Sequence, residues 1–122
     1  MAEKLLIILA TTDPRNVLQL IPALSQATVA AAMEFKVEVI FTGYSGEVAK
    51  KGVADALPVG PEKTKTIYDM ICEAHDAGVK FKVCTSALEA WGNGLIDQVE
   101  ETVGGAYLIS EAMDPGTVVF TY

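Results

Sequence analysis

The sequence predicts an α/β fold built around a mostly parallel sheet of five strands. Continuous apolar runs, such as residues 5–9, are typical of strands that helices cover on both faces. Segments with helical spacing alternate with these runs, which implies parallel strands joined by right-handed crossovers. The chain has 122 residues, 51% of them hydrophobic, so we expect a single domain, residues 1–122, with its own core.

The order of the elements follows from apolar spacing and from helix-start and helix-stop residues. After the first strand, Asp13 and Pro14 favour a helix start, with Asp as the N-cap and Pro at the first helical position. This helix should run to about residue 34, with a kink or restart at Pro22. The later elements are expected to be a strand at 37–42, a turn at 43–46, a short helix at 47–51, a loop at 56–63, a helix at 64–77, a strand at 79–83, a helix at 85–91, a strand at 99–103, a helix at 105–113 and a strand at 117–122.

The helix expected at 14–34 has apolar residues around most of its circumference. A chain this short offers little material to cover such a helix on every side. We therefore expect one side to pack on the sheet and another to contact a second subunit. Complete burial within one chain is the alternative.

The charge distribution limits the classes of partner. The formal net charge is −7, and residues 83–122 hold six acidic residues but no Lys or Arg. Binding to nucleic acid is not expected, because nothing in this region could displace phosphate counterions. An acidic face around Cys84 would attract a basic protein partner, although most of these carboxylates could serve solubility alone.

The chain is expected to act in the cytoplasm. Residues 5–10 are too short for the apolar core of a signal peptide, and no apolar run is long enough to span a bilayer, so no membrane association is expected. The two cysteines, Cys72 and Cys84, suit a reducing compartment, so a disulfide between them is not expected.

Cys84 stands where the third core strand meets the helix at 85–91. A thiol at such a junction faces unpaired backbone N–H groups and the positive end of the helix dipole, which favour the thiolate. The acidic residues nearby oppose this effect, so we expect an exposed thiol whose pKa is modestly lowered. A small buried cysteine that only fills space is the alternative.

Ligand sites in open parallel sheets lie beyond the carboxyl ends of the strands. Cys84 is therefore the candidate catalytic residue at this edge. The candidate binding residues at the same edge are Thr11, Thr12, Thr42, Gly43, Thr85 and Ser86, with Asp13, Tyr44 and Ser45 beside them.

Several known cysteine chemistries do not fit the spacing. A low-molecular-weight phosphatase needs an Arg six residues after its Cys, where this chain has Ala90, and a thioredoxin motif needs a second Cys at position 87, which is Ala. The only histidine, His75, lies on the preceding helix, so we do not expect it to contact Cys84 as a base. Cys72 and His75 share a helix face but have no second pair of ligands, so no metal is expected.

The run at residues 78–88, which includes Cys84, is followed by Gly92 and Gly94 and by the segment 114–121. Together with the strand at 5–10, the helix start at Asp13 and the segment 37–43, these features resemble the DsrE/DsrF/TusD-like family of small sulfur-relay proteins. The resemblance covers nearly the whole chain. It implies a flavodoxin-like three-layer sandwich without flavin or any other cofactor.

The resemblance also implies a function. In the family, a cysteine after the third core strand accepts sulfane sulfur as a persulfide and passes it to a partner, often a TusA-like carrier, and Cys84 matches that position. Members assemble as trimers or hexamers, homomeric or mixed. The chain is thus expected to be a sulfurtransferase or sulfur carrier. The alternatives are a non-catalytic oligomeric binding or regulatory module with a packed Cys84, and a small-molecule or nucleotide pocket at the same strand ends.

Overall fold

In the computed structural model, which describes residues 2–62, 64–92 and 94–122, strands and helices alternate along the chain. The elements are β1 (Lys4–Leu9), α1 (Val17–Ala32), β2 (Lys36–Phe41), the 3₁₀ helices η1 (Gly43–Ala49) and η2 (Ala54–Ala56), β3 (Pro58–Val59), β4 (Lys65–Thr66), α2 (Ile67–Asp76), β5 (Lys80–Cys84), α3 (Thr85–Trp91), β6 (Val99–Val103), α4 (Gly105–Ala112) and β7 (Thr117–Thr121).

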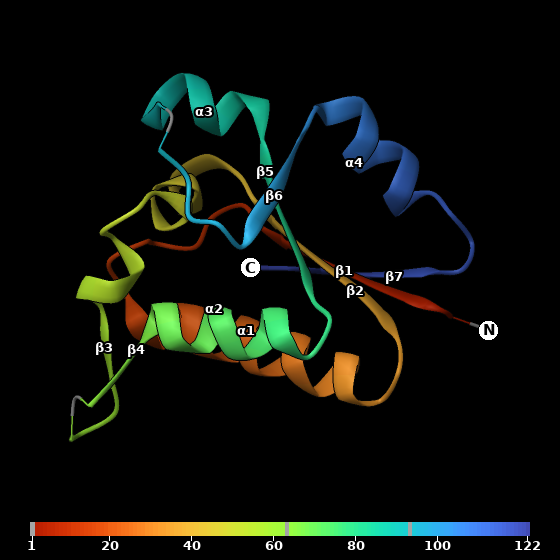
Figure 1. The fold of residues 1–122 in the computed structure, drawn as a ribbon. Helices are drawn as coiled ribbons and strands as arrows, with labels where there is room; N and C mark the ends of the chain where they lie inside the picture. The colour runs from red at the N-terminus through yellow and green to blue at the C-terminus, as the bar shows by residue number, and fades with distance from the viewer. Residues whose placement is uncertain (1, 63, 93) are drawn as a thin grey trace.

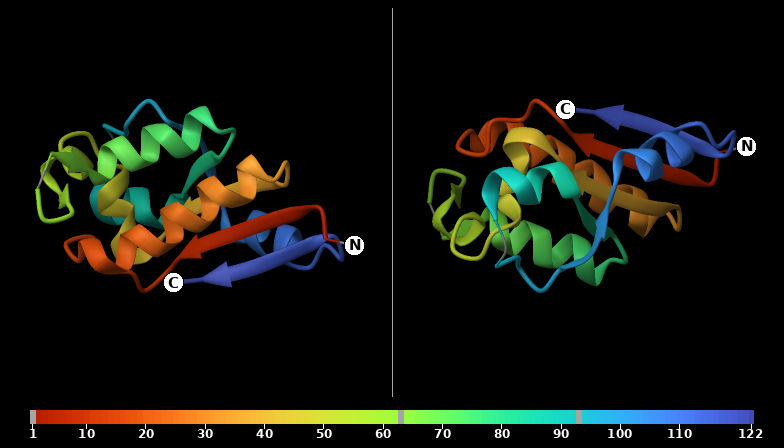
Figure 2. Two further views of the ribbon diagram at one scale, coloured as in Figure 1. Left: turned by 90° about the horizontal axis from the view of Figure 1, so that it is seen from below. Right: turned by 90° about the horizontal axis from the view of Figure 1, so that it is seen from above.

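Five strands form one sheet in the order β6-β5-β2-β1-β7, and each of the four pairings is parallel. Helices α1 and α2 lie side by side against one face, and α4 lies against the other (Figure 1). Helix α3 lies beyond the carboxyl end of β5 and packs against η1 (Figure 2). The predicted α/β three-layer architecture is confirmed, with a sheet that is parallel throughout.

The larger part of the core lies between the sheet and the pair α1 and α2. At its centre, Phe41 of β2 and Phe81 of β5 are fully buried and stack with ring centroids 5.8 Å apart. The opposite face carries a smaller apolar cluster, in which Leu6, Ile40 and Val103 are buried beneath α4. Helix α4 therefore rests on less apolar surface than α1 and α2 do.

Helix α1 begins later than the sequence predicts. Its N-cap is Asn16, whose side chain accepts a hydrogen bond from the backbone N–H of Leu18. Asp13 instead accepts from the N–H of Arg15 at 2.9 Å and so belongs to a turn that precedes the helix. The helix then continues through Pro22 to Ala32 as one element.

Several boundaries shift by one or two residues, and three other segments differ more clearly from prediction. The 3₁₀ helix η1 begins at Gly43, so the expected turn and short helix are one element. Helix α2 begins at Ile67 rather than 64, because Thr66 and Asp69 form a capping box there. The expected loop at 56–63 contains β3 of a short antiparallel hairpin with β4, and its last residue, Lys63, lies outside the described residues. In the part of the chain that the structure describes, no helix is long and apolar enough to cross a membrane.

Candidate functional site

Cys84 ends β5 and is the N-cap residue of α3, in extended backbone conformation. Side chains alternate between the two faces of a strand, so Cys84 and Lys82 point to the same face. Lys82 donates a hydrogen bond to Tyr107 of α4 at 2.7 Å. The thiol therefore lies on the α4 side of the sheet, at its carboxyl edge.

Thr42 lies beside the thiol at the end of the neighbouring strand. Phe41 pairs with Val83 across β2 and β5, so the residues that follow, Thr42 and Cys84, are adjacent. The Thr42 backbone N–H donates to the hydroxyl of Ser45 at 3.1 Å, which fixes the strand end. The Thr42 hydroxyl lies close enough to the thiol to favour its ionised form.

Hydrogen-bond donors surround the Cys84 sulfur. The Ser86 hydroxyl donates to Sγ at 3.3 Å, whereas no side-chain capping bond forms between the sulfur and the first N–H groups of α3. Burial by itself raises the pKa of the thiol, but the Ser86 hydroxyl, the Thr42 hydroxyl and the backbone N–H groups of Ser86 and Thr85 favour the thiolate, and the net effect lowers the pKa below its usual value. The direction agrees with the expectation drawn from the strand-to-helix junction.

The expectation of an exposed thiol is wrong for this structure. Cys84 is buried, with 6% of its surface exposed, whereas Thr85 and Ser86 beside it are exposed. The physical reason is that alternation along β5 places the thiol on the α4 side of the sheet, at the start of α3, where little of its surface remains exposed. Any thiol that reacts with Cys84 has to reach the small part of its surface that remains exposed.

The segment after β2 is held tightly against α3. Gly43 has a φ of 58°, and a Cβ there would lie 2.8 Å from the carbonyl oxygen of Ala10, so only glycine fits. The indole N–H of Trp91 donates to the Gly43 carbonyl at 3.0 Å. At Gly46, a Cβ would lie 2.6 Å from the Cβ of Ala87. These contacts hold the end of β2 against the helix that begins at the thiol.

Thr11 and Thr12 do not join these contacts. The backbone N–H of Thr11 donates to the carbonyl of Tyr122 at 2.9 Å, so the chain turns toward β7 when it leaves β1. Both threonines line a cavity of about 300 Å³ together with Gln19, Pro22 and Tyr122. Of the predicted site residues, the structure thus gathers Cys84, Thr42, Thr85 and Ser86, with Gly43 as their support. It places Thr12 elsewhere, whereas Thr11 also lines another cavity together with Tyr44 and Trp91.

The comparisons with known proteins agree with this architecture. A model of the DsrE/DsrF-like family matches residues 4–121. The chain belongs to the DsrE/DsrF-like family. The crystal structure of the YchN protein from E. coli is similar over 100% of both chains, with a TM-score of 0.77 and 19% identity, a likeness that concerns the fold. No curated protein matches the chain.

Family membership confirms the resemblance seen in residues 78–88 and 114–121. It is consistent with a part in sulfur relay in general. In this DsrE/DsrF-like chain, Cys84 occupies the strand end at which the resemblance expects the sulfur-carrying residue.

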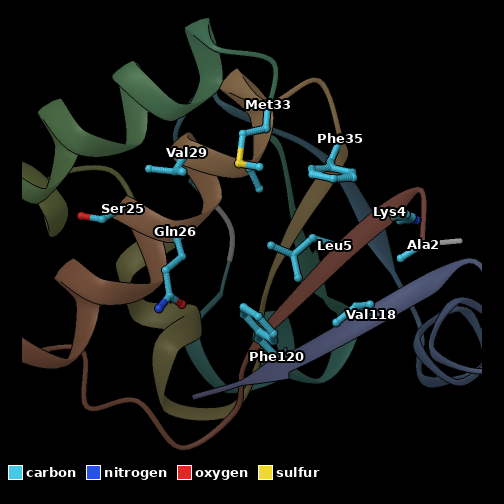
Figure 3. A pocket seen from close by; sticks show the side chains of 11 residues that line it. Ala2, Lys4, Leu5, Ser25, Gln26, Val29, Met33, Phe35, Val118 and Phe120 are labelled. Carbon is cyan, nitrogen blue, oxygen red and sulfur yellow. The ribbon is translucent and has the colours of Figure 1, made fainter.

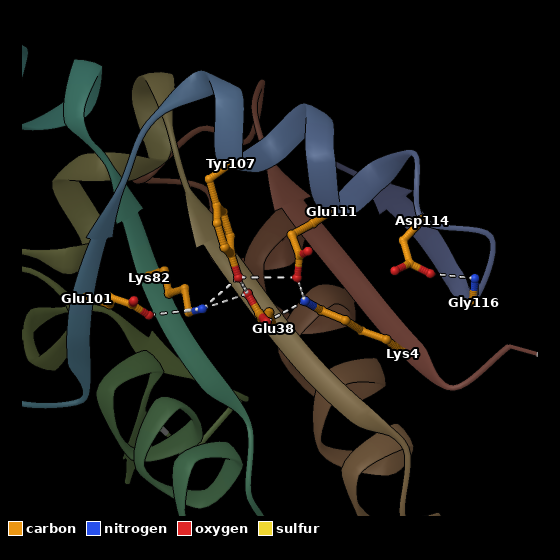
Figure 4. A network of polar contacts seen from close by, with 8 residues as sticks. All are labelled: Lys4, Glu38, Lys82, Glu101, Tyr107, Glu111, Asp114 and Gly116. Atoms are coloured by element: carbon orange, nitrogen blue, oxygen red, sulfur yellow. Dashed lines mark hydrogen bonds and ion pairs between the residues drawn. The ribbon is translucent and has the colours of Figure 1, made fainter.

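A buried polar network lies on the same face as Cys84, beneath α4 (Figure 4). Glu38 of β2 is at its centre: it pairs with Lys4 at 2.5 Å and with Lys82 at 3.0 Å, and accepts a hydrogen bond from the Tyr107 hydroxyl. The side chains of Lys4, Glu38 and Lys82 are 13%, 11% and 9% exposed. Glu111 of α4 pairs with Lys4, so two residues of α4 anchor the helix to the charged part of the sheet.

The network keeps its members charged although they are buried. Burial raises the pKa of Glu38, but the hydrogen bonds from Lys4, Tyr107 and Lys82 outweigh it, so the net pKa is lowered. Burial lowers the pKa of Lys82, but its bonds to Tyr107, Glu101 and Glu38 raise the net pKa. Sequence reasoning missed this network. The sequence does contain a sign of it, because charged and apolar residues alternate in Lys36-Val37-Glu38-Val39 and in Lys80-Phe81-Lys82-Val83. Such alternation places the charged side chains on one face of each strand.

Cys72 and His75 lie on the far side of the sheet from the thiol, on α2. Both are half-buried; Cys72 accepts a hydrogen bond from Gln98 at 3.6 Å, and His75 pairs with Glu100 at 2.9 Å. Within residues 2–62, 64–92 and 94–122, no three His, Cys, Asp or Glu side chains gather closely enough to hold a metal ion.

A second cavity, of about 430 Å³, lies between α1 and the edge strand β7 (Figure 3). Its walls are mostly apolar, and Val29, Met33 and Phe120 in them are 58%, 62% and 40% exposed. Helix α1 covers β1 and β2 but leaves this side of β7 open. The sequence analysis did not predict an apolar surface on β7. It did predict that one side of the first helix would not be covered by the rest of the chain, because apolar residues surround most of that helix.

Proposed function

We propose that the chain is a sulfur carrier that takes up sulfane sulfur as a persulfide on Cys84 and passes it to a partner protein. The Cys84 thiolate attacks the outer sulfur of a donor persulfide, the donor S–S bond breaks, and the donor leaves as a thiolate. A thiolate of the acceptor, a TusA-like carrier, then attacks the outer sulfur of the Cys84 persulfide and releases the Cys84 thiolate. Each step exchanges one S–S bond for another, so no external oxidant, reductant or cofactor takes part.

The observation that carries this proposal is the set of donors around the Cys84 sulfur. The thiolate and the persulfide anion both need hydrogen-bond donors, and Thr42, Thr85 and Ser86 supply them at one strand end. The family to which the chain belongs is consistent with sulfur relay. Two free cysteines suit the reducing cytoplasm, where we place the relay.

The burial of Cys84 limits which sulfur donors and acceptors can reach it. A small donor such as inorganic polysulfide can reach a residue that is 6% exposed, whereas a globular surface cannot. The protein partner therefore has to present its thiol on an extended segment that passes between the exposed residues Thr85 and Ser86 and the α4 side of the sheet.

Intact-protein mass spectrometry tests the proposal. The reduced protein is incubated with inorganic polysulfide and its mass is compared with that of two variants. The wild type and Cys72→Ser are expected to gain sulfur atoms that dithiothreitol removes, and Cys84→Ser is expected to gain none. Cys72→Ser is the matched control, because Cys72 is the other free thiol and is more exposed than Cys84. A gain in Cys84→Ser equal to that of the wild type would reject Cys84 as the carrier.

The burial of Cys84 also favours a second candidate, a binding or regulatory module in which the cysteine only packs. The same experiment separates the two candidates. In the second case, neither the wild type nor Cys72→Ser would gain sulfur on Cys84 while the fold is intact.

We also propose that the chain forms a homo-oligomer, a trimer or hexamer, through the apolar surface between α1 and β7. Helix α1 contains no charged residue, and a second copy would bury the exposed Val29, Met33 and Phe120. Light scattering coupled to size exclusion should give the mass of an oligomer for the wild type and a smaller mass for Val29→Lys. Leu18→Lys is the control, because Leu18 is 79% exposed on the same helix but does not line the cavity. A monomeric wild type would contradict the proposal.

A further inference from the structure

A third cavity, of about 360 Å³, opens where the loop before α1 meets η1 and α3. Tyr44 and Trp91 supply two aromatic walls. Its charged lining residues are Asp13, Glu47 and Arg15, two carboxylates and one guanidinium, so the lining carries a net negative charge. Nothing in the function proposed above uses this cavity.

Glu47 lacks a partner for one of its oxygens. Its Oε1 accepts from the guanidinium of Arg15 at 2.9 Å, and the side chain is 15% exposed. Its Oε2 is buried and has no hydrogen-bond partner among the residues that the structure describes. A buried carboxylate oxygen without a donor is unfavourable. Glu47 lines the cavity, so a donor that enters there can satisfy the carboxylate once its side chain turns and brings this oxygen to the cavity surface.

We propose that this cavity binds a basic side chain, lysine or arginine, of the partner protein. A cationic N–H group supplies the donor that Glu47 lacks, and the faces of Tyr44 and Trp91 attract cations. An anion would meet the carboxylates of Asp13 and Glu47 and is disfavoured. Helix α3, which carries Trp91, adds the carboxylate of Glu89 and no basic residue, which also favours a basic partner.

The cavity is connected to the thiol through α3. Cys84 is the N-cap of this helix and Trp91 is its last residue, so its seven residues separate the two by about 10 Å. The Trp91 indole is bonded to Gly43, which follows the Thr42 that contacts the thiol. The inference rests on the proposed function in one respect: the partner held here is the one that exchanges sulfur with Cys84. A basic residue in the cavity would keep that partner's thiol-bearing segment within reach.

Trp91 is the only tryptophan of the chain, so its fluorescence reports on the cavity directly. The probe is the peptide acetyl-Gly-Lys-Gly-amide, and acetyl-Gly-norleucine-Gly-amide is its neutral counterpart of similar shape. We expect the lysine peptide to change Trp91 emission saturably, with a dissociation constant of about 10 mM or tighter, and the norleucine peptide to bind at least about fivefold more weakly. Glu47→Gln should weaken binding of the lysine peptide about tenfold, because it removes a charge-assisted hydrogen bond.

Glu89→Gln is the matched control, because Glu89 is an exposed carboxylate of α3 that does not line the cavity. It should bind the lysine peptide as the wild type does, at the same ionic strength. Equal binding of both peptides, an equal loss in Glu47→Gln and Glu89→Gln, or no saturable change in the wild type would each overturn the inference. Thermal unfolding of Glu47→Gln, compared with that of Glu89→Gln, shows that its fold is intact.

The two proposals can fail separately. Sulfur uptake by Cys84 from inorganic polysulfide should be unchanged in Glu47→Gln, because Glu47 does not contact the thiol. If Cys84 takes up no sulfur but the lysine peptide binds in the predicted way, the relay is rejected and the cation site remains. If Cys84 is loaded normally but the peptide does not bind, the cation site is rejected and the relay remains.

Discussion

Among the charged side chains, we expect the loss of Glu38 to lower the free energy of unfolding most. Glu38→Leu removes the carboxylate that pairs with both Lys4 and Lys82 and accepts from Tyr107. Removal of one partner from a buried ion pair typically costs 3–5 kcal/mol, because the other charge stays buried. Each lysine keeps one other carboxylate, Glu111 or Glu101, so we expect the lower end, about 3 kcal/mol.

Urea denaturation measured by far-UV circular dichroism checks this value. With a slope of about 1–3 kcal/mol per M urea, a loss of about 3 kcal/mol lowers the midpoint by about 1–3 M. Glu101→Leu is the control, because Glu101 pairs with the same Lys82 but is 60% exposed, and its loss should cost about 1 kcal/mol or less. The double variant Glu38→Leu/Lys82→Met should recover part of the lost stability, because the buried lysine that loses its Glu38 partner is then replaced by an apolar side chain. Equal costs for Glu38→Leu and Glu101→Leu would refute the claim that burial makes this network important.

Three further outcomes are expected. Gly43→Ala should lower stability by about 1–3 kcal/mol in thermal unfolding, because φ is 58° and the new Cβ would clash with the Ala10 carbonyl oxygen. The control is Gly60→Ala, which also has a positive φ but no atom of the described residues near the new Cβ, and it should lower stability less. Thr66→Ala should cost about 1 kcal/mol, since it removes the N-cap of α2, and urea midpoints measure the loss. The pKa of Glu38 is lowered in the folded state, so its ionised form stabilises the fold. This stabilisation is complete above the unfolded-state pKa of about 4.3 and is lost as the pH falls through the folded-state pKa. The difference in stability between the wild type and Glu38→Leu should therefore shrink in acid titrations.

The sequence was most informative where local signals and tertiary packing agree. Helix α3 and strand β6 have the boundaries that apolar spacing and the glycine at position 92 predict. The start of α1 was missed because Asp13 and Asn16 are both good N-cap residues. The choice between them is made by the turn in which Asp13 bonds Arg15, which spacing alone does not reveal.

The site was predictable in part, for a similar reason. Strand ends in a parallel sheet share one edge, so the neighbourhood of Thr42 and Cys84 followed from the order of elements. Thr11 and Thr12 follow β1 but turn toward β7, and the sequence does not tell where the last strand joins the sheet. The burial of Cys84 depends on the face to which it points, and the alternating charges of β5 were the signal that could have indicated it.

The central claim is that main-chain and hydroxyl donors stabilise a Cys84 thiolate in a covered position. The rate at which iodoacetamide alkylates Cys84, followed across pH by residue-resolved mass spectrometry, tests it most directly. The account predicts a midpoint below the value of about 8.5 for a free cysteine and a shift to higher pH in Ser86→Ala, which loses the hydroxyl 3.3 Å from the sulfur. A midpoint at or above that of a free cysteine, or a folded protein in which Cys84 does not react, would contradict it.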